Sequence, residues 1–160
     1  MINNTSDKIL LAVFVIINSI LYFLSYDGST FIEAADASQY YAPALSFIEN
    51  GEFLSFDGKP LTFGPPLYSI FIAIPIFTFG IDESAAAIVF MQCTLLYLTG
   101  FLSRYILLKF TNRFGLLLHA LVIFNPNSLI TAHLVQSETL FTFLLVWSVV
   151  IAFKIVADPS

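Results

Sequence analysis

The sequence predicts an all-α polytopic membrane protein. Apolar residues fill 58% of the 160 positions and charged residues only 11%, and the mean hydropathy is +0.88. Soluble domains carry about 25% charged residues. The charges also fall almost entirely outside four long apolar runs. The net charge of −5 gives no indication of a nucleic-acid partner, and the single Cys93 excludes an intrachain disulfide. We therefore expect one membrane domain over 1–160.

The first apolar run covers about 9–26. Its eighteen residues carry no charge, and a helix of that length is about long enough to cross a ~30 Å hydrocarbon core. Lys8 precedes the run, and no small-x-small cleavage site follows it. This pattern predicts an uncleaved signal anchor with a cytoplasmic amino terminus rather than a removed signal peptide.

Three later runs, at about 85–108, 114–133 and 140–156, predict three further spans. Asn125-Pro126 interrupts the third of the four spans. Proline removes a helical hydrogen bond and kinks the helix, which is tolerable where the break faces protein or a water-filled cavity. A cavity beneath the outer mouth and a simple packing kink both fit.

The segment 27–84 is a long outer loop with the composition of a folded cap. Within it, 37–50 predicts an amphipathic juxtamembrane helix, because its apolar residues recur at helical spacing and Gly51 follows as a stop signal. Two tyrosines on its apolar face indicate that it lies along the membrane interface.

A further apolar run, 67–80, has fourteen residues with Pro75 inside. That length suits an interfacial or re-entrant helix better than a full span. The positive-inside rule favours the same interpretation. With four spans, five of the six basic residues lie in the cytoplasm and only Lys59 lies outside. If 67–80 crossed the membrane, Arg104, Lys109 and Arg113 would move outside.

The predicted topology gathers acidic residues on the non-cytoplasmic side, and two of them are candidates for chemistry. Asp36 precedes the amphipathic helix and Glu138 begins the fourth span. A structural explanation exists for each, because Asp36 with Gln39 forms a capping-box pattern and an acid in a first turn suits the helix dipole. However, a carboxylate at a membrane boundary is costly unless it has a partner. His133, five residues earlier, is a candidate hydrogen-bond partner at the same surface.

Several short motifs follow one another along the chain. In order, they are Asp36-Ala-Ser-Gln-Tyr40, Asn50-Gly51-Glu52-Phe53, Gly64-Pro65-Pro66-Leu67-Tyr68, Phe79-Gly80, Asn125-Pro126 and Ser137-Glu138-Thr139-Leu140-Phe141. This order resembles a known family, the GT-C fold membrane glycosyltransferases of the protein O-mannosyltransferase and lipid A aminoarabinose transferase superfamily. The resemblance covers the amino-terminal part of that fold, from Ile9 to about Phe153.

The resemblance implies transfer of a sugar from a polyprenyl-phosphate donor to an acceptor hydroxyl at the outer face, in a bacterial inner membrane. Asp36 would be the general base, and Glu138 would complete the acidic pair. The two carboxylates are also the expected ligands of a divalent metal, and Tyr40, Lys59 and His133 are expected to bind substrate. Departing phosphate needs cations, and this outer face supplies few.

Two features depart from the family. Many relatives carry an acidic-basic pair before the proline, where this chain has Phe63-Gly64. Family members also have many more spans, so we expect an amino-terminal fragment or one piece of a split enzyme, with a missing carboxy-terminal portion or partner chain. Two other functions stay open. One is a non-catalytic four-span scaffold or subunit that binds a partner through its acidic loop. The other is a transporter, against which no span has a charge near its middle.

Overall fold

The computed structural model describes residues 4–25, 37–60, 66–111 and 113–157, and these residues form an almost entirely helical structure. The only β-structure in this part of the chain is an isolated bridge between Leu54 and Pro60. The all-α class predicted from composition is therefore confirmed for the described ranges. The helices are α1 (Asn4–Ser25), α2 (Ala37–Asn50), α3 (Pro66–Phe79), α4 (Ser84–Leu107), α5 (Gly115–Ile123), α6 (Pro126–His133) and α7 (Glu138–Ala157).

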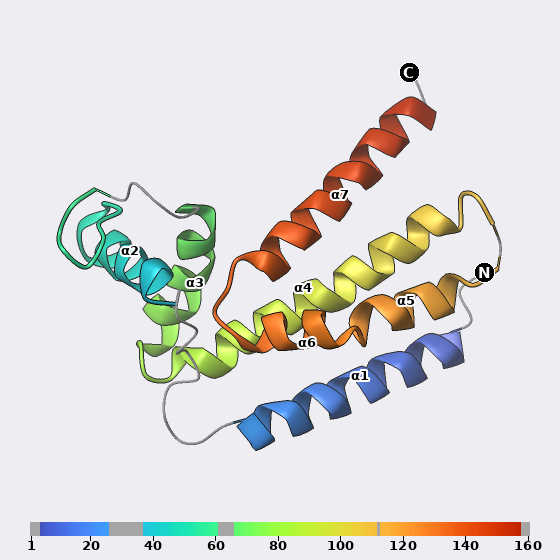
Figure 1. Cartoon of the computed structure of the whole chain (residues 1–160), viewed down its shortest axis with the longest axis horizontal. Coiled ribbons are helices and arrows are strands. Elements are labelled where there is room, and N and C mark those ends of the chain that lie inside the picture. The colour runs from blue at the N-terminus through green and yellow to red at the C-terminus, as the bar shows by residue number, and fades with distance from the viewer. Residues whose placement is uncertain (1–3, 26–36, 61–65, 112, 158–160) are drawn as a thin grey trace.

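Helix α4 is the centre of the arrangement (Figure 1). It packs against α3, α5, α6 and α7. Helix α1 runs alongside α5 (Figure 1) and also meets α4, where Cys93 contacts Asn18. Helices α2 and α3 pack on each other at one end of the molecule, where α4 and α7 begin (Figure 1). We call this the loop end. The opposite end, where α4 and α7 finish, carries Arg104, Lys109 and Lys154, and we call it the basic end.

Within the described ranges, three helices are long and apolar enough to cross a membrane, namely α1, α4 and α7. Helices α5 and α6 meet the same criterion together but are bent by 49° at their junction, so the number rises to four if the pair is one span. Helix α3 is apolar but has only 14 residues. These lengths support a membrane protein. The number of crossings and their orientation stay predictions.

Asn125 explains why the chain breaks between α5 and α6. Its side-chain oxygen accepts hydrogen bonds from the backbone N–H groups of Asn127, at 3.0 Å, and Ser128, at 3.2 Å. Pro126 occupies the first turn of α6, where a missing N–H costs nothing. The interruption is thus a helix end followed by a capped restart, rather than a bend within one continuous helix.

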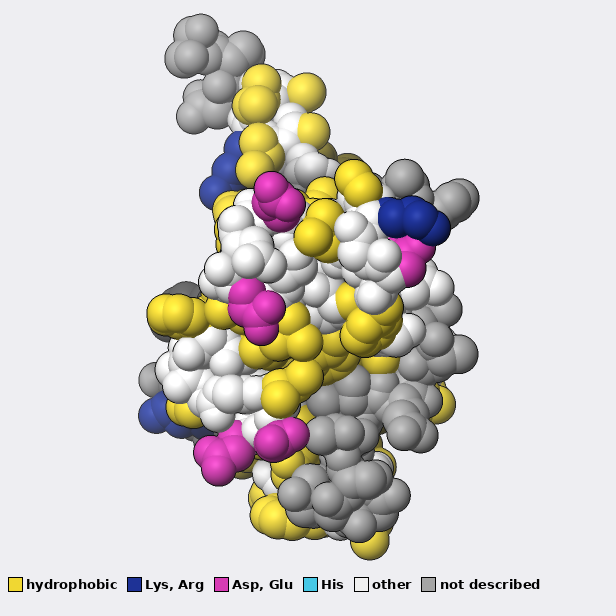
Figure 2. Space-filling model, turned by 90° about the vertical axis from the view of Figure 1, so that its left-hand side faces the viewer, with side chains coloured by type: hydrophobic (Ala, Val, Ile, Leu, Met, Phe, Trp, Pro, Cys, Tyr) yellow, Lys and Arg dark blue, Asp and Glu magenta, His cyan; other side chains and the backbone are white. Residues whose placement is uncertain are grey.

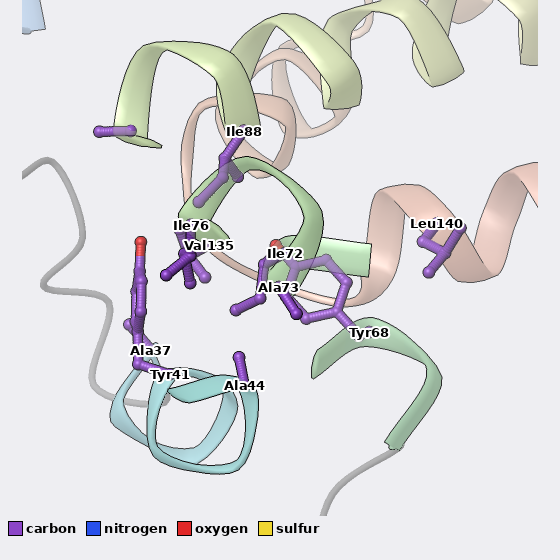
Figure 3. Packing of buried hydrophobic residues seen from close by; sticks show 11 residues of the cluster. Ala37, Tyr41, Ala44, Tyr68, Ile72, Ala73, Ile76, Ile88, Val135 and Leu140 are labelled. Atoms are coloured by element: carbon purple, nitrogen blue, oxygen red, sulfur yellow. The ribbon is translucent and has the colours of Figure 1, made fainter. Parts of the chain in front are cut away.

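Helix α2 packs its apolar face on α3. Tyr41 and Ala44 of α2 join Ile72 and Ala73 of α3 in a buried cluster, which Figure 3 shows at the loop end. The face that we expected along the membrane interface is therefore covered by another helix of the chain. Burial of apolar surface stabilises a fold by about 25 cal/mol per Å2. The contact between these side chains therefore fixes α2 on α3.

Candidate functional site

Glu138 is the first residue of α7, at the loop end. Its side chain is exposed, and no hydrogen bond or ion pair joins it to another described residue. The position suits a carboxylate, because the first turn of a helix carries partial positive charge. Glu138 is thus free to meet a ligand, or simply to favour the helix dipole.

Asp36, its predicted partner, lies outside the described residues, as do Phe63 and Gly64. The next residue, Ala37, begins α2 and is only 3% exposed. Ala37 belongs to the same buried cluster as Val135 and Leu140, which flank Glu138 in sequence (Figure 3). The start of α2 and the start of α7 are therefore parts of one core, although the chain between them is about 100 residues long.

Tyr40 joins these two helix starts directly. Its hydroxyl lies 3.2 Å from the Ser137 hydroxyl, the residue just before Glu138. The Tyr40 ring also packs edge-on against Tyr68 of α3, with 4.8 Å between centroids. Tyr40 was predicted to bind substrate. In the structure it is half-buried, and its contacts with Ser137 and Tyr68 join α2, α3 and the start of α7. Substrate binding by Tyr40 stays a prediction.

Tyr68 extends this arrangement into a buried hydrogen-bond network. Its hydroxyl donates to the Gln92 side-chain oxygen at 2.8 Å. The Gln92 amide then donates to the backbone carbonyls of Ala132, at 3.1 Å, and Leu134, at 2.8 Å. Gln92 and Tyr68 are both almost fully buried. The network ties α3 and α4 to the turn that positions Glu138.

The sequence reasoning missed both members of this network. The signal was present, because Gln92 is a strongly polar side chain in the middle of the apolar run 85–108. A polar side chain in such a run almost always faces protein and has a partner. Tyr68 could not be identified as that partner from spacing, since it lies on another helix.

Burial controls the chemistry of the tyrosines at this end. Burial raises the pKa of Tyr41 well above its ordinary value of 10.0. Burial also raises the pKa of Tyr68, and the charges of Tyr41, Tyr40 and Glu138 add smaller contributions in the same direction. Both phenols therefore stay protonated and do not act as bases. Tyr68 donates its hydrogen bond to Gln92, whereas the buried Tyr41 hydroxyl has no hydrogen-bond partner among the described residues.

His133 was predicted to bind substrate, and its ring is buried. One ring nitrogen, Nδ1, lies 2.9 Å from the Leu129 carbonyl, and Nε2 lies 3.4 Å from the Asn18 carbonyl of α1. The first contact lies within α6, and the second links α6 to α1. The predicted hydrogen bond between His133 and a carboxylate is not among its contacts with described residues.

Lys59 lies on a short turn after α2. Its ammonium group pairs with Asp57 at 2.7 Å, and both side chains are exposed. The hydrogen bond from Lys59 lowers the pKa of Asp57, and a bond from Ser55 lowers it further. Gly58, with φ of +73°, permits the turn. The charge of Lys59 is thus already matched by its neighbour, and a substrate phosphate would have to compete with Asp57.

Within the described ranges, no group of three or more His, Cys, Asp or Glu side chains is placed to hold a metal ion. The predicted metal ligands were Asp36 and Glu138. Since Asp36 is not among the described residues, a metal shared by that pair stays a prediction.

A groove of about 460 Å3 lies between α1 and α4 near the loop end. Its walls are mostly apolar and include Phe14, Tyr22 and Val89. At its base, the Cys93 thiol donates to the Asn18 side-chain oxygen at 3.3 Å. None of the predicted site residues lines this groove. Its apolar walls offer a long apolar chain a place to lie.

Comparison of the chain with family models, with curated proteins and with solved structures found no match.

Proposed function

We propose that this chain carries the acceptor end of a membrane glycosyltransferase, with Asp36 as general base and Glu138 as its acidic partner. The observation that carries the proposal is the hydrogen bond between Tyr40 and Ser137. It joins the beginnings of α2 and α7, and the two carboxylates stand in sequence at those beginnings. The order of motifs that resembles GT-C enzymes supports the same assignment.

The reaction would use these groups in a simple way. An acceptor hydroxyl is a weak nucleophile, and a positioned carboxylate can take its proton in the transition state. The acceptor oxygen then bonds to the anomeric carbon of the sugar, while the bond from that carbon to the polyprenyl phosphate breaks. The departing phosphate keeps the bonding electrons. The apolar groove between α1 and α4 lies at the same end and suits the polyprenyl chain of the donor.

A divalent metal, if bound, would neutralise charge on the departing phosphate. Asp36 and Glu138 would hold it, and carboxylate oxygens are suitable ligands for such ions. Further cationic groups from a carboxy-terminal portion or a partner chain would serve the same purpose.

The convergence of the two carboxylates can be tested without knowing the substrate. Cys93 is the only cysteine, so Cys93→Ala provides a background in which Asp36→Cys and Glu138→Cys can be combined. A disulfide forms only where the Cα atoms approach within about 7 Å. We expect this pair to cross-link on mild oxidation in membranes. The matched control is Glu49→Cys with Glu138→Cys, because α2 has 14 residues and places Glu49 about 20 Å from its start.

Activity is tested with polyprenyl-phosphate mannose and polyprenyl-phosphate aminoarabinose as donors, in membranes that contain the chain. The rate at which the lipid-linked sugar is consumed should fall about 100-fold or more in Asp36→Asn, as expected for removal of a general base. Glu52→Gln removes an exposed acid elsewhere in the loop and should leave the rate unchanged. If the Asp36→Cys/Glu138→Cys pair cross-links no faster than the Glu49→Cys/Glu138→Cys control, the two acids do not converge and the proposal is wrong.

The alternative is a scaffold or subunit that binds a basic partner through its loop end. The observation that favours it is the exposure of the acidic side chains there, which stand at separate points among apolar and uncharged atoms (Figure 2). A scaffold would keep its binding in Asp36→Asn and lose it when several exposed acids are neutralised together. A catalytic site gives the opposite result.

A further inference from the structure

The basic end of the molecule brings two ammonium groups from different helices to one aromatic ring. The Lys109 ammonium lies 5.0 Å from the centroid of the Tyr105 ring, and the Lys154 ammonium lies 5.7 Å from it. Both distances fall within the ~6 Å range of cation–π attraction. Lys109 follows the end of α4, and Lys154 lies in the last turn of α7. Two positive charges therefore share one ring, although they repel each other.

Aromatic packing holds these charges together. Phe110 of the α4 side and Phe153 of α7 meet edge to face, with 5.5 Å between their centroids. Each phenylalanine is the sequence neighbour of one of the two lysines. The lysines are thus brought together by contacts that do not depend on charge, and the cost of their repulsion has to be offset by something else.

No carboxylate in the described part of the chain offsets it. The ion pairs there are Lys59 with Asp57 and Arg104 with Asp7. Asp7 is already paired with Arg104. The C-terminal carbonyls of each helix favour the lysine near them, but they do not bridge the two. Asp158 lies outside the described residues.

The surroundings of the two lysines are apolar. Phe110 is 71% exposed, Ile155 67% and Val156 80%. In a helix that crosses a membrane, such surface is covered by lipid chains. Tyr105 is half-buried near the end of α4, and tyrosine is enriched at the level of the headgroups. A pair of cations at that level, beside apolar surface, matches a lipid that has both a phosphate and acyl chains.

We propose that Lys109, Lys154 and Tyr105 form a binding site for the phosphate of an anionic lipid headgroup. The phosphate oxygens accept hydrogen bonds from both ammonium groups and remove their repulsion. The acyl chains lie along exposed apolar side chains that precede Lys154 in α7, such as Val149 and Ile151. The site is at the opposite end from Asp36 and Glu138, and it does not depend on the function proposed there.

Native mass spectrometry of the purified chain tests this site, after exchange into equal amounts of phosphatidylglycerol and phosphatidylcholine. We expect the chain to retain phosphatidylglycerol in preference. The preference should fall about 25-fold in the double variant Lys109→Gln/Lys154→Gln, given the typical contribution of each juxtamembrane lysine. Lys109→Arg/Lys154→Arg keeps both charges and should keep the preference. Lys59→Gln removes a positive charge from the turn after α2, at the loop end, and should also keep the preference.

Two results would overturn the site. The first is equal retention of phosphatidylglycerol by the chain and by Lys109→Gln/Lys154→Gln, which would show that the two lysines do not bind the anionic lipid. The second concerns the source of the phosphate. If inorganic phosphate alone raises the melting temperature of the detergent-solubilised chain as much as phosphatidylglycerol does, the ligand is a soluble phosphate and the lipid assignment is wrong. We expect no such rise, since inorganic phosphate has no chains to cover the apolar surface.

Discussion

Polar side chains are buried in different ways against the two halves of α4. Toward the loop end, Gln92 makes hydrogen bonds through both its oxygen and its nitrogen. Toward the basic end, neither ring nitrogen of the buried His119 makes a normal hydrogen bond with a described residue. Arg104 pairs with Asp7 through one guanidinium nitrogen, while its Nε has no such partner. The Gln92 network joins one half of α4 to its neighbours, whereas an ion pair and close packing join the other half to α1 and α5.

The difference indicates which interactions each half depends on. In a lipid surrounding, a polar group without a partner costs several kcal/mol. The Gln92 network therefore specifies one position for the turn before α7. The basic half has no comparable network, so α1 and α5 have to be held to α4 by Asp7 and by the fit around Gly100. Removing those two features should damage the basic half more than any single hydrogen-bond loss damages the loop half.

The largest effect is expected from Asp7→Leu. The change leaves the Arg104 guanidinium buried without its partner, and breaking a buried pair costs about 3 kcal/mol or more. Unfolding of the detergent-solubilised chain by sodium dodecyl sulfate measures the loss. The control is Asp7→Leu/Arg104→Leu, which removes both charges and should recover much of the stability. A double variant as unstable as the single one would show that the charge pair is not what holds α1 to α4.

Gly100→Val should be the next most damaging change. A Cβ atom at Gly100 would lie 2.4 Å from His119 Cδ2 and 2.6 Å from Ile123 Cγ2, so α5 has to move away from α4. Overpacking of this kind costs about 2–3 kcal/mol. The same unfolding assay measures it. The second-site change His119→Ala makes room and should restore part of the loss. If it restores nothing, the close contact between α4 and α5 is not the cause.

Gln92→Leu should lower the free energy of unfolding by a smaller amount, about 2 kcal/mol, because it leaves the Tyr68 hydroxyl and two carbonyls without their partner. Tyr68→Phe removes only one hydrogen bond of the same network and should cost about 1 kcal/mol. Both are measured by the same unfolding midpoint. Equal losses in the two variants would mean that the carbonyls of Ala132 and Leu134 find other donors, and the contrast between the halves of α4 would weaken.

The sequence was sufficient for features set by local chemistry. Composition predicted the helical class, and Asn125-Pro126 marked the break between α5 and α6 because cap and proline act within a few residues. What covers a helix face is a different matter. The apolar face of α2 has the same pattern whether it meets lipid or α3, and only the structure places Tyr41 against Ile72.

The candidate site divides along the same line. Glu138 could be placed at the start of a helix from its neighbours in sequence, since the apolar run begins there. Its surroundings could not be predicted, because Tyr40 and Ser137 are 97 residues apart and no periodicity links them. Whether Asp36 meets Glu138 is a question of the same long-range kind.

The exposed ion pair of Asp57 and Lys59 gives the smallest predicted effect, and it sharpens the contrast with Asp7 and Arg104. The hydrogen bond from Lys59, and then that from Ser55, lower the pKa of Asp57 below its ordinary value of 3.8. The charged carboxylate therefore favours the folded turn above that value, and this contribution disappears as the pH falls through the lowered pKa. Solvent surrounds both groups, so the unfolding midpoint of Asp57→Asn should match that of the unchanged chain.

The turn itself should respond to pH. The amide signal of Gly58, whose N–H donates to the Ser55 carbonyl at 2.9 Å, should titrate with a midpoint below 3.8 and lose that titration in Asp57→Asn. A shift of the unfolding midpoint as large as that of Asp7→Leu would contradict the view that burial, rather than pairing, decides what an ion pair contributes in this protein.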